Sequence, residues 1–488
     1  MFYIKIHLLY FIFTFFWITF SFGFTTNIDT LRSPNNQADY LIIAVDSFQT
    51  SLALLQIHRQ SQGLNVTYVD VNQIYQEFGD SLSSAKRIRH FISYAIEFWQ
   101  SPKPKYVLLF GDSEIIPSFK LESFLSGLGE DSVAIDEWFA VNQFDSDEVV
   151  DIAIGRIPAS TITEAELFSS KVVHFEDSVN ASNYNHDFLV LADSSDSGSQ
   201  YFEELADDFI SYLSPYNLRI SRIDIRHSSP FYGTLNDFIT VINNGILFLN
   251  YFGAGEKKIW SIDTFFTYRD VAILENDDLP FIMTTVTGAQ NFDYSDDSTI
   301  VEQLLFHNSG GAIATFASVG ICYINTAISV NFDLYQYILA HPDSTLGTAV
   351  FQIKQGYPTY SPPDNNYRRM TLLGDPALKL PPDFLTSLRR NREPKINKIY
   401  LSQNYPNPFN PITTIQFNIP KTSEVSLKIF NVVGEEVTTL VSGQLPAGNY
   451  TCEWNGSKVA SGVYLYKLES EGYIQTRKMV LMSRITFS

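Results

Sequence analysis

Two segments of this chain place a small, polar break directly after an apolar run that reads as a buried strand. In the first, Ile246–Leu249 leads into Asn-Tyr-Phe-Gly-Ala-Gly-Glu at 250–256. In the second, Leu279–Met283 leads into Thr-Thr-Val-Thr-Gly-Ala-Gln-Asn-Phe-Asp at 284–293. Breaks at the carboxyl ends of strands are where α/β sheets present their chemistry. Neither break contains a cysteine or a histidine, so neither supplies a thiol nucleophile or an imidazole base.

Further motifs surround these two segments. They are Gly111-Asp112-Ser-Glu-Ile-Ile-Pro117 after the apolar run Tyr106–Phe110, Asp151-Ile-Ala-Ile-Gly-Arg-Ile-Pro158, Gly310-Gly-Ala-Ile-Ala-Thr315 and Leu373-Gly-Asp-Pro-Ala-Leu-Lys-Leu380. Taken in this order, the motifs resemble the gingipain family, the C25 peptidases, over roughly residues 38–381. The resemblance implies cysteine-dependent endopeptidase chemistry and a caspase-like α/β fold of two subdomains, with the site in the second.

The resemblance also implies a catalytic pair that this chain lacks. In the gingipain family a histidine stands between two glycines after one strand, and a cysteine follows the next strand, a few residues before a Phe-Asp pair. The histidine position carries Ala254 here, and the cysteine position carries Thr287. A shift of the second position would place Val286 or Gly288 there, and neither supplies a thiol.

The loss of both residues removes the family's chemistry. A peptide-cleaving cysteine needs a thiolate, which an imidazole creates by taking the proton that it later returns to the leaving amine. Ala254 can do neither, and a threonine hydroxyl without an adjacent base is a weak nucleophile. Backbone amides near Gly255 and Thr287 could still form an oxyanion hole, so we expect Gly253 and Gly255 to line a surviving peptide-binding cleft. A purely structural role for these loops is the alternative.

Two acidic residues are further candidates for the site. Asp112 follows the strand Tyr106–Phe110, where its side chain could orient a ligand or cap the next turn; we favour the cap. Asp136 precedes Trp138 and Phe139, near where the gingipain family carries an acidic and aromatic pair, and could line a pocket. A structural role is again the favoured reading, because the sequence alone does not show that a residue belongs to a pocket.

A displaced nucleophile is the enzymatic alternative. The chain has only two cysteines, Cys322 and Cys452, and the second lies in the C-terminal part. Cys322 follows the apolar run Ala312–Phe316, but its expected role is packing, because free cysteine is among the most buried residue types. It would become a catalytic candidate only with a suitably placed histidine, and the nearest in sequence are His307 and His341.

The net charge and the acidic clusters of the chain indicate which partners and ions it could bind. The formal net charge of −20 makes nucleic acid and anionic lipid unsuitable partners. The clusters Asp193-Ser-Ser-Asp196 and Asp293-Tyr-Ser-Asp-Asp297 could offer oxygen ligands to Ca²⁺, which the resemblance to the calcium-binding gingipains also implies, but neither has EF-hand spacing. We expect solvated acidic loops, with Ca²⁺ as the alternative and no other cofactor.

Residues 1–24 have the pattern of an export signal. Lys5 and His7 precede an apolar run from Leu8 to Phe20, and Ser21-Phe-Gly23 approximates a small-x-small cleavage site. This run is shorter than the roughly 20 residues that a spanning helix needs, which favours a cleaved signal peptide over an uncleaved anchor. No later segment approaches membrane-spanning length without charges, so we expect no stable membrane span.

Apolar runs alternate with amphipathic stretches over 38–183 and again over 184–381, which predicts two α/β subdomains. The first is expected to contain strands at Tyr40–Val45, Val66–Val71, Tyr106–Phe110 and Val149–Ile154, and helices at Leu52–Ser61, Ala85–Trp99 and Thr163–Phe175. The second is expected to begin with strands at Phe188–Ala192 and Leu218–Ile225 and helices at Tyr201–Leu213 and Leu235–Asn243.

The C-terminal part is expected to be separate. Residues 382–398 are basic, polar and proline-punctuated, which predicts an exposed linker. Over 399–488 short alternating strands predict a small antiparallel, immunoglobulin-like sandwich, in which Val425, Leu427 and Ile429 share one face. The motifs that carry a family resemblance are Leu401-Ser-Gln-Asn-Tyr-Pro-Asn-Pro-Phe-Asn-Pro411, Val425-Ser-Leu-Lys-Ile-Phe-Asn431, Leu445-Pro-Ala-Gly-Asn-Tyr450 and Ala460-Ser-Gly-Val-Tyr-Leu-Tyr466.

These motifs resemble the type A sorting domain of the type IX secretion system. The resemblance implies passage through the outer membrane by that machinery, and attachment at the cell surface or release from it. Together with Ala254 and Thr287, it leads to the hypothesis of a secreted pseudo-peptidase that binds a peptide or protein. The alternatives are an active cysteine endopeptidase that uses Cys322 and a structural cell-surface module.

Overall fold

The computed structural model describes residues 30–79, 82–122, 132–145, 149–180, 183–194, 200–216, 218–261, 263–277, 279–285, 292, 299–356, 366–381, 384, 399–401, 404, 407, 409–446 and 448–482. The expected signal peptide and Thr287 lie outside these residues, as do the acidic cluster 293–297 and most of the expected linker. Within the part of the chain that is described, every helix is too short or too polar to cross a membrane.

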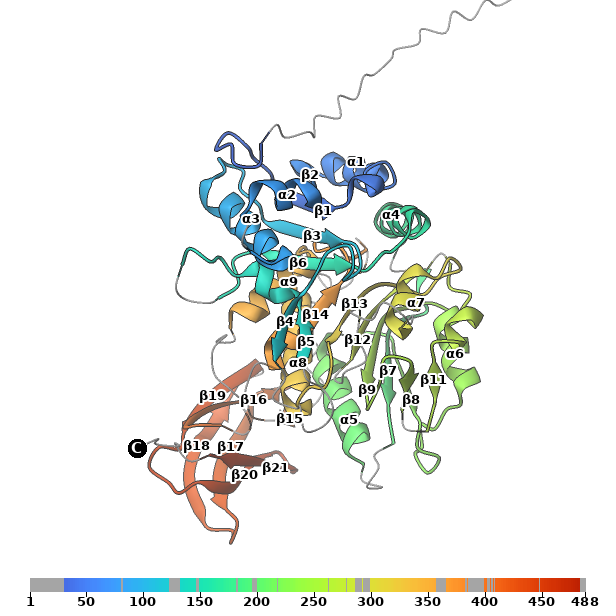
Figure 1. Ribbon diagram of the computed structural model, residues 1–488. Coiled ribbons are helices and arrows are strands. Elements are labelled where there is room, and N and C mark those ends of the chain that lie inside the picture. The colour runs from blue at the N-terminus through green and yellow to red at the C-terminus, as the bar shows by residue number, and fades with distance from the viewer. Residues whose placement is uncertain are drawn as a thin grey trace, which may run out of the picture.

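One ten-stranded sheet runs through both α/β subdomains, in the order β2-β1-β3-β6-β14-β13-β12-β9-β7-β8 (Figure 1). The first subdomain supplies β1 (Tyr40–Ala44), β2 (Val66–Asp70), β3 (Tyr106–Phe110) and β6 (Ala153–Ile157). The second supplies β7 (His186–Ala192), β8 (Ile220–Asp224), β9 (Ile246–Phe252), β12 (Phe281–Thr285), β13 (Ala312–Ser318) and β14 (Met370–Leu373). Neighbours within each set pair in parallel, except that β14 is antiparallel to β13. The mostly parallel α/β sheet is confirmed.

Helices cover the sheet (Figure 1). The first subdomain contains α1 (Ala53–Ser61), α2 (Val71–Glu77), α3 (Ser84–Phe98) and α4 (Ile162–Asp177), and the second contains α5 (Tyr201–Leu213), α6 (Leu235–Asn243), α7 (Ile300–Phe306), α8 (Ile324–Ala340), α9 (Leu346–Gln355) and α10 (Asn366–Arg369). Successive residues of β1 enter two different hydrophobic clusters, Ile42 on one face and Leu41 and Ile43 on the other. Both faces of this strand are therefore buried, as in a layered α/β fold.

Several strand boundaries differ from expectation, and local contacts explain two of them. The strand expected at Val149–Ile154 begins later, at Ala153, because Val150 instead forms an isolated bridge with Val141. The strand expected to reach Val71 ends at Asp70, whose side chain accepts a hydrogen bond from the Asn72 amide and caps α2. Two short hairpins were not expected: β4 (Phe119–Glu122) with β5 (Ser132–Ile135), and β10 (Ile259–Trp260) with β11 (Phe266–Thr267).

The C-terminal part forms two antiparallel sheets (Figure 1). One contains β15 (Tyr400–Leu401), β16 (Ile412–Ile419) and β19 (Gly448–Asn455), and the other contains β17 (Ser423–Asn431), β18 (Glu436–Leu445), β20 (Gly462–Ser470) and β21 (Tyr473–Leu481). Both sheets contribute to one hydrophobic cluster, which includes Phe417 and Trp454 from the first and Leu427, Tyr466 and Met479 from the second. The expected sandwich is confirmed.

The expected linker begins inside the core of the α/β part. The Phe384 side chain is fully buried, and its ring centroid lies 5.7 Å from that of Phe248 on β9. The expectation of an exposed segment from 382 is therefore wrong at Phe384, because aromatic packing against the sheet buries this residue.

Candidate functional site

The turn after β9 (Ile246–Phe252) contains Ala254, the residue expected at the family's histidine position. Ala254 and Gly255 are partly exposed, whereas Gly253 is buried. A Cβ atom at Gly253 would lie only 2.3 Å from the Tyr251 ring, so the turn needs glycine there to pass over this tyrosine. Ala254 thus occupies an accessible position at the end of a central strand, but presents only a methyl group.

Asp193 holds this turn in place. It follows β7 directly, and its buried carboxylate accepts hydrogen bonds from the Ala254 amide (3.1 Å, Oδ2) and the Ser261 hydroxyl (2.6 Å, Oδ1). The Tyr251 hydroxyl lies 2.8 Å from both Asp193 Oδ2 and the Ala254 carbonyl oxygen. Burial raises the pKa of Asp193, and the hydrogen bonds from Ser261, Tyr251 and the backbone oppose that shift. We call Asp193, Tyr251, Ala254 and Ser261 the Asp193 network.

Sequence reasoning missed this network. It treated Asp193 as part of a solvated acidic loop or a calcium ligand, but the carboxylate is buried and both of its oxygens bond to the turn after β9. The solvated reading is therefore wrong for Asp193. The available signal was its position directly after the apolar run Phe188–Ala192, since side chains at adjacent strand ends meet. Among the described residues there is no group of three or more acidic, histidine or cysteine side chains that could hold a metal ion.

Two stacked aromatic side chains, Tyr251 and Trp260, support the turn after β9. The Tyr251 and Trp260 rings stack with centroids 5.0 Å apart, and both side chains are fully buried. The Trp260 Nε1 atom has no hydrogen-bond partner among the described residues. Both ends of the 254–261 segment are fixed, because the Ser261 amide donates to the Ala254 carbonyl at 2.9 Å.

The backbone N–H of Gly255 takes no part in the hydrogen bonds that hold the turn together. Gly255 pairs with Trp260 in an isolated antiparallel bridge whose two hydrogen bonds use the amides of Glu256 and Ser261. The Gly255 amide therefore donates to none of the groups that the structure describes, although the residue is partly exposed. A backbone N–H on a rigid turn can donate a hydrogen bond to a carbonyl oxygen of a bound peptide.

Thr287, the residue expected at the family's cysteine position, lies outside the described residues. The described residues on either side of it are Thr285 and Phe292. β12 ends at Thr285, and the next described residue, Phe292, is buried. The Arg156 guanidinium lies 5.0 Å from the centre of the Phe292 ring, a cation–π contact that brings the first subdomain against the segment that follows β12.

Asp136 is bound to Arg156 and is not free to line a ligand site. Arg156 Nη2 donates to Asp136 Oδ1 at 2.9 Å, Nε donates to Oδ2, and the Ser118 hydroxyl donates to Oδ1 at 3.0 Å. Both members of the pair are buried. The remaining Arg156 donor, Nη1, reaches the carbonyl oxygens of Gly111 (2.7 Å) and Ile116 (2.9 Å). Asp136 therefore stabilises the loop after β3.

Asp112 caps that same loop. Its Oδ1 atom accepts hydrogen bonds from the amides of Glu114 and Ile115, both at 3.0 Å. These contacts are those of a turn-forming aspartate. Asp112 also lies close to Glu302 in the first turn of α7, whose pKa is raised to about 7 by burial, with smaller contributions from the charges of Asp112 and Glu164.

Cys322 lies four residues beyond β13, in contact with the main hydrophobic core. Burial raises the pKa of its thiol to about 11. The two histidines nearest in sequence are engaged elsewhere: His307 Nε2 lies 2.9 Å from the Leu274 carbonyl oxygen, and the His341 ring stacks on Tyr337.

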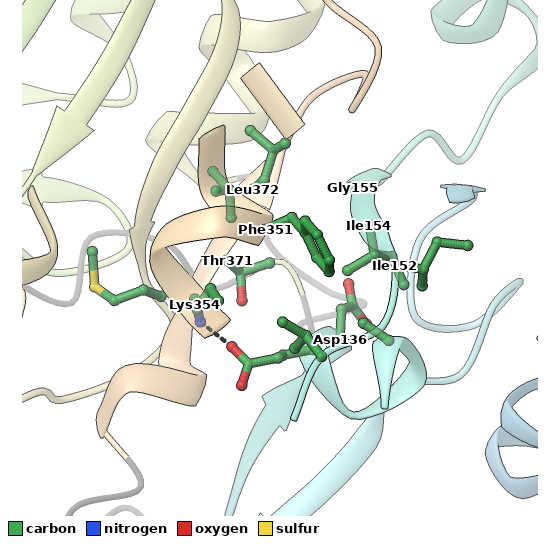
Figure 2. Close-up of a pocket in the computed structure, with 13 residues that line it drawn as sticks. Asp136, Ile152, Ile154, Gly155, Phe351, Lys354, Thr371 and Leu372 are labelled. Atoms are coloured by element: carbon green, nitrogen blue, oxygen red, sulfur yellow. Dashed lines mark hydrogen bonds and ion pairs between the residues drawn. The ribbon is translucent and has the colours of Figure 1, made fainter. Parts of the chain in front are cut away.

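A small cavity lies between β6, β14 and α9 (Figure 2). Its volume of about 30 Å³ has room for roughly one water molecule. Figure 2 shows Lys354 pointing into it, where the ammonium forms an ion pair with Glu137 and also donates to the Tyr367 carbonyl. Asp136 lines the cavity, but the space is too small for a peptide side chain of ordinary size.

Comparisons with known proteins agree with this architecture. The model of peptidase family C25 matches residues 33–381, and that of the secretion system C-terminal sorting domain matches residues 403–482. No curated protein matches the chain. The crystal structure of the Arg-specific cysteine proteinase gingipain R (RgpB) is similar, with a TM-score of 0.57 and 15% identity over 92% of this chain and 99% of that chain.

A complex of Porphyromonas gingivalis RgpB pro- and mature domains gives a TM-score of 0.56 at 15% identity, covering 91% of this chain and 100% of that one. Another structure, described only as a protease, gives 0.57 at 17% identity, covering 92% of this chain and 98% of that chain. At these identities the similarity shows the fold alone.

Proposed function

The chain belongs to peptidase family C25 and carries a secretion sorting domain, and from this premise we propose that it acts at the cell surface as a pseudo-peptidase that binds a peptide or protein without cleaving it. The sorting domain implies secretion to the cell surface. The proposal adds that the first 24 residues are a signal peptide and that the peptidase site has lost its chemistry.

Ala254 carries the proposal. The position at which the family's base is expected holds a methyl group, on a turn that hydrogen bonds to Asp193 and Tyr251 hold in place. Asp193 is the only carboxylate in the Asp193 network, and its two oxygens already accept hydrogen bonds from Tyr251, Ala254 and Ser261. A carboxylate with that many donors is committed to positioning the turn and cannot also accept a proton from a nucleophile.

Retention of binding rests on the geometry of Gly255. Gly255 is partly exposed, and its turn is supported by the Tyr251 ring and by the Asp193 carboxylate. A rigid donor loses little entropy when a peptide carbonyl binds, which favours affinity. The Asp193 network therefore supports a binding site that has outlived its catalytic residues.

The test uses the exported chain and a fluorescent library of random decapeptides. We expect saturable binding, no cleavage product, and no labelling by peptide probes that carry a thiol-reactive group. Gly255→Pro removes the amide N–H, whereas Gly255→Ala keeps it, so binding should fall roughly tenfold in the first variant and little in the second. Cleavage by the wild-type chain would sink the proposal.

An active peptidase that uses Cys322 is the second candidate, and the raised pKa of the thiol and the contacts of His307 and His341 weigh against it. If the wild-type chain cleaves peptides, Cys322→Ser should abolish cleavage, while Cys452→Ser should leave it unchanged. A structural surface module is the third candidate. It would show neither cleavage nor saturable binding in the same experiment.

A further inference from the structure

Arg477 of the sorting domain contacts the peptidase-like domain. Its Nη1 and Nη2 atoms donate to Oδ2 and Oδ1 of Asp208, at 2.9 and 2.6 Å, and its Nε atom donates to the Leu401 carbonyl oxygen at 2.7 Å. The two residues lie 269 positions apart in the chain, on β21 and α5. All three guanidinium nitrogens are therefore used, two of them in a bidentate carboxylate contact, which is the most specific geometry for this pair.

Three of the acidic residues on α5 pair with arginines. The helix carries four acidic residues, Glu203, Glu204, Asp207 and Asp208. Arg226 pairs with Glu203 and Arg222 with Asp207, and both arginines belong to the same subdomain as α5. Asp208 instead receives its arginine from the sorting domain.

The pair is shielded from solvent but not deeply buried. The side chains of Arg477 and Asp208 are 15% and 32% exposed, respectively. The Leu401 residue that accepts the third bond is itself fully buried in the sandwich core, so the guanidinium is oriented before it meets α5. A preoriented arginine loses less entropy on contact than a free one.

The fold similarity spans both parts of the chain. The match to gingipain R covers 92% of the residues, whereas the peptidase family model ends at residue 381, so the superposition extends into the β-sandwich.

We propose that the sorting domain docks on α5 in one orientation, held by the Arg477–Asp208 pair, so that the region of β21 around Arg477 is an internal interface. The docked module leaves its remaining surfaces for partners outside the chain. This inference is independent of whether the peptidase-like domain binds peptides.

Charge reversal tests the docking in the full-length chain. Asp208→Arg or Arg477→Asp alone should raise the radius of gyration measured by small-angle X-ray scattering, and should speed hydrogen exchange in 473–481 roughly tenfold. The double variant restores opposite charges at the same positions and should return both measurements toward those of the wild-type chain. Lys458→Asp, an equal change of charge at an exposed loop of the same sandwich, is the matched control and should change neither.

Asp208→Asn is a second variant for the case in which the charge-reversed chains fail to fold, because it keeps the size of the side chain and removes only the charge. It should show the same effects in weaker form. Docking by this pair is overturned if the single reversals leave scattering and exchange at their wild-type values while the chain stays folded, or if the double reversal does not restore them.

Discussion

At the scale of single residues, the acidic side chains around the degenerate site are structural. Asp112 caps a turn, Asp136 pairs with buried Arg156, and Asp193 holds the turn after β9. The sequence favoured a structural role for Asp112 and Asp136, which their contacts bear out, whereas it grouped Asp193 with a solvated acidic loop or a calcium site. All three carboxylates accept hydrogen bonds from backbone, hydroxyl or arginine donors, as polar groups withdrawn from solvent must.

The Asp136–Arg156 pair makes a clear stability prediction. Asp136→Ala leaves a fully buried guanidinium without its counter-ion, so the free energy of unfolding should fall by about 3–5 kcal/mol. The measurement is urea denaturation followed by circular dichroism. The double variant Asp136→Ala with Arg156→Met should lose less than the single variant, because no uncompensated charge stays buried. An equal or larger loss in the double variant would contradict this account.

Cys322 makes a pH-dependent prediction. With a thiol pKa of about 11, only roughly one molecule in a thousand carries the thiolate at pH 8. In a Cys452→Ser background, iodoacetamide should therefore label Cys322 very slowly at pH 8 and faster as the pH approaches 11. The measurement is mass spectrometry of the intact chain over time. Rapid labelling at pH 7 would instead reveal an activated thiol and favour the displaced-nucleophile hypothesis.

At the scale of elements, helix α7 begins with a capping box formed by Thr299 and Glu302. Glu302 closes the capping box of α7, accepting from the Thr299 amide (2.8 Å) and hydroxyl (3.0 Å). The same carboxylate faces the charges of Asp112 and Glu164 and is partly buried. The capping box therefore stabilises the start of α7, whereas burial and the charges of Asp112 and Glu164 disfavour the negative charge on Glu302.

Glu302→Gln should reveal this conflict. Because its folded-state pKa of about 7 exceeds the usual value near 4.3, the contribution of Glu302 is fully present below about pH 4 and is lost as pH rises through 7. Glutamine preserves the capping box, so the variant should be more stable than wild type at pH 8, by about 1–2 kcal/mol, with little difference at pH 4. Thermal unfolding at both pH values measures the change.

The capping box of α6 provides a control of opposite sign. The Asp237 side chain accepts hydrogen bonds from the Thr234 hydroxyl and amide, which lower the pKa of this carboxyl group. Its contribution to stability is therefore present above its ordinary pKa and is lost as pH falls. Asp237→Asn should destabilise the chain at pH 8, and a gain in stability there for both variants would contradict the charge argument.

At the scale of the whole molecule, the β-sandwich and the α/β part have separate hydrophobic cores. The sandwich cluster draws its buried residues from 401–481, and the α/β part forms the other two clusters. Arg477 and Asp208 join the parts through a polar pair. A polar pair of this kind holds orientation but does not merge two hydrophobic cores.

Core truncation should therefore act on one part at a time. Leu427→Ala, in the sandwich, should lower the free energy of unfolding of that domain by about 2–5 kcal/mol and leave the unfolding of the α/β part unchanged. Leu108→Ala is the matched substitution in the α/β part and should show the converse. Differential scanning calorimetry of the full chain resolves the transitions. A common shift of both transitions in either variant would show a single cooperative unit.

Local sequence patterns predicted many elements correctly. The apolar run at Tyr106–Phe110 and the amphipathic stretches at Tyr201–Leu213 and Leu235–Asn243 have the bounds that were expected. These elements are set by periodicity and by nearby caps, which are properties of neighbouring residues. The alternation at Val425, Leu427 and Ile429 likewise identified the buried face of β17.

Contacts between distant segments could not be predicted in this way. The Asp193–Ala254 bond joins residues 61 positions apart, and the Arg477–Asp208 pair joins residues 269 apart. Periodicity carries no information about which strand ends or helix faces become neighbours. For this reason Asp193 was grouped with its acidic sequence neighbours and not with the turn that it holds.

The sequence alone determined that this chain has the family's strand framework and sorting motifs, and it predicts alanine at the family's histidine position, because these follow from residue identity and short-range pattern. Only the tertiary structure decided which groups bind the carboxylates of Asp112, Asp136 and Asp193, that Phe384 belongs to the core, and that Arg477 meets α5. The physical reason is that burial and pairing of a charge depend on what the folded chain brings near it, and that is settled by packing across hundreds of residues.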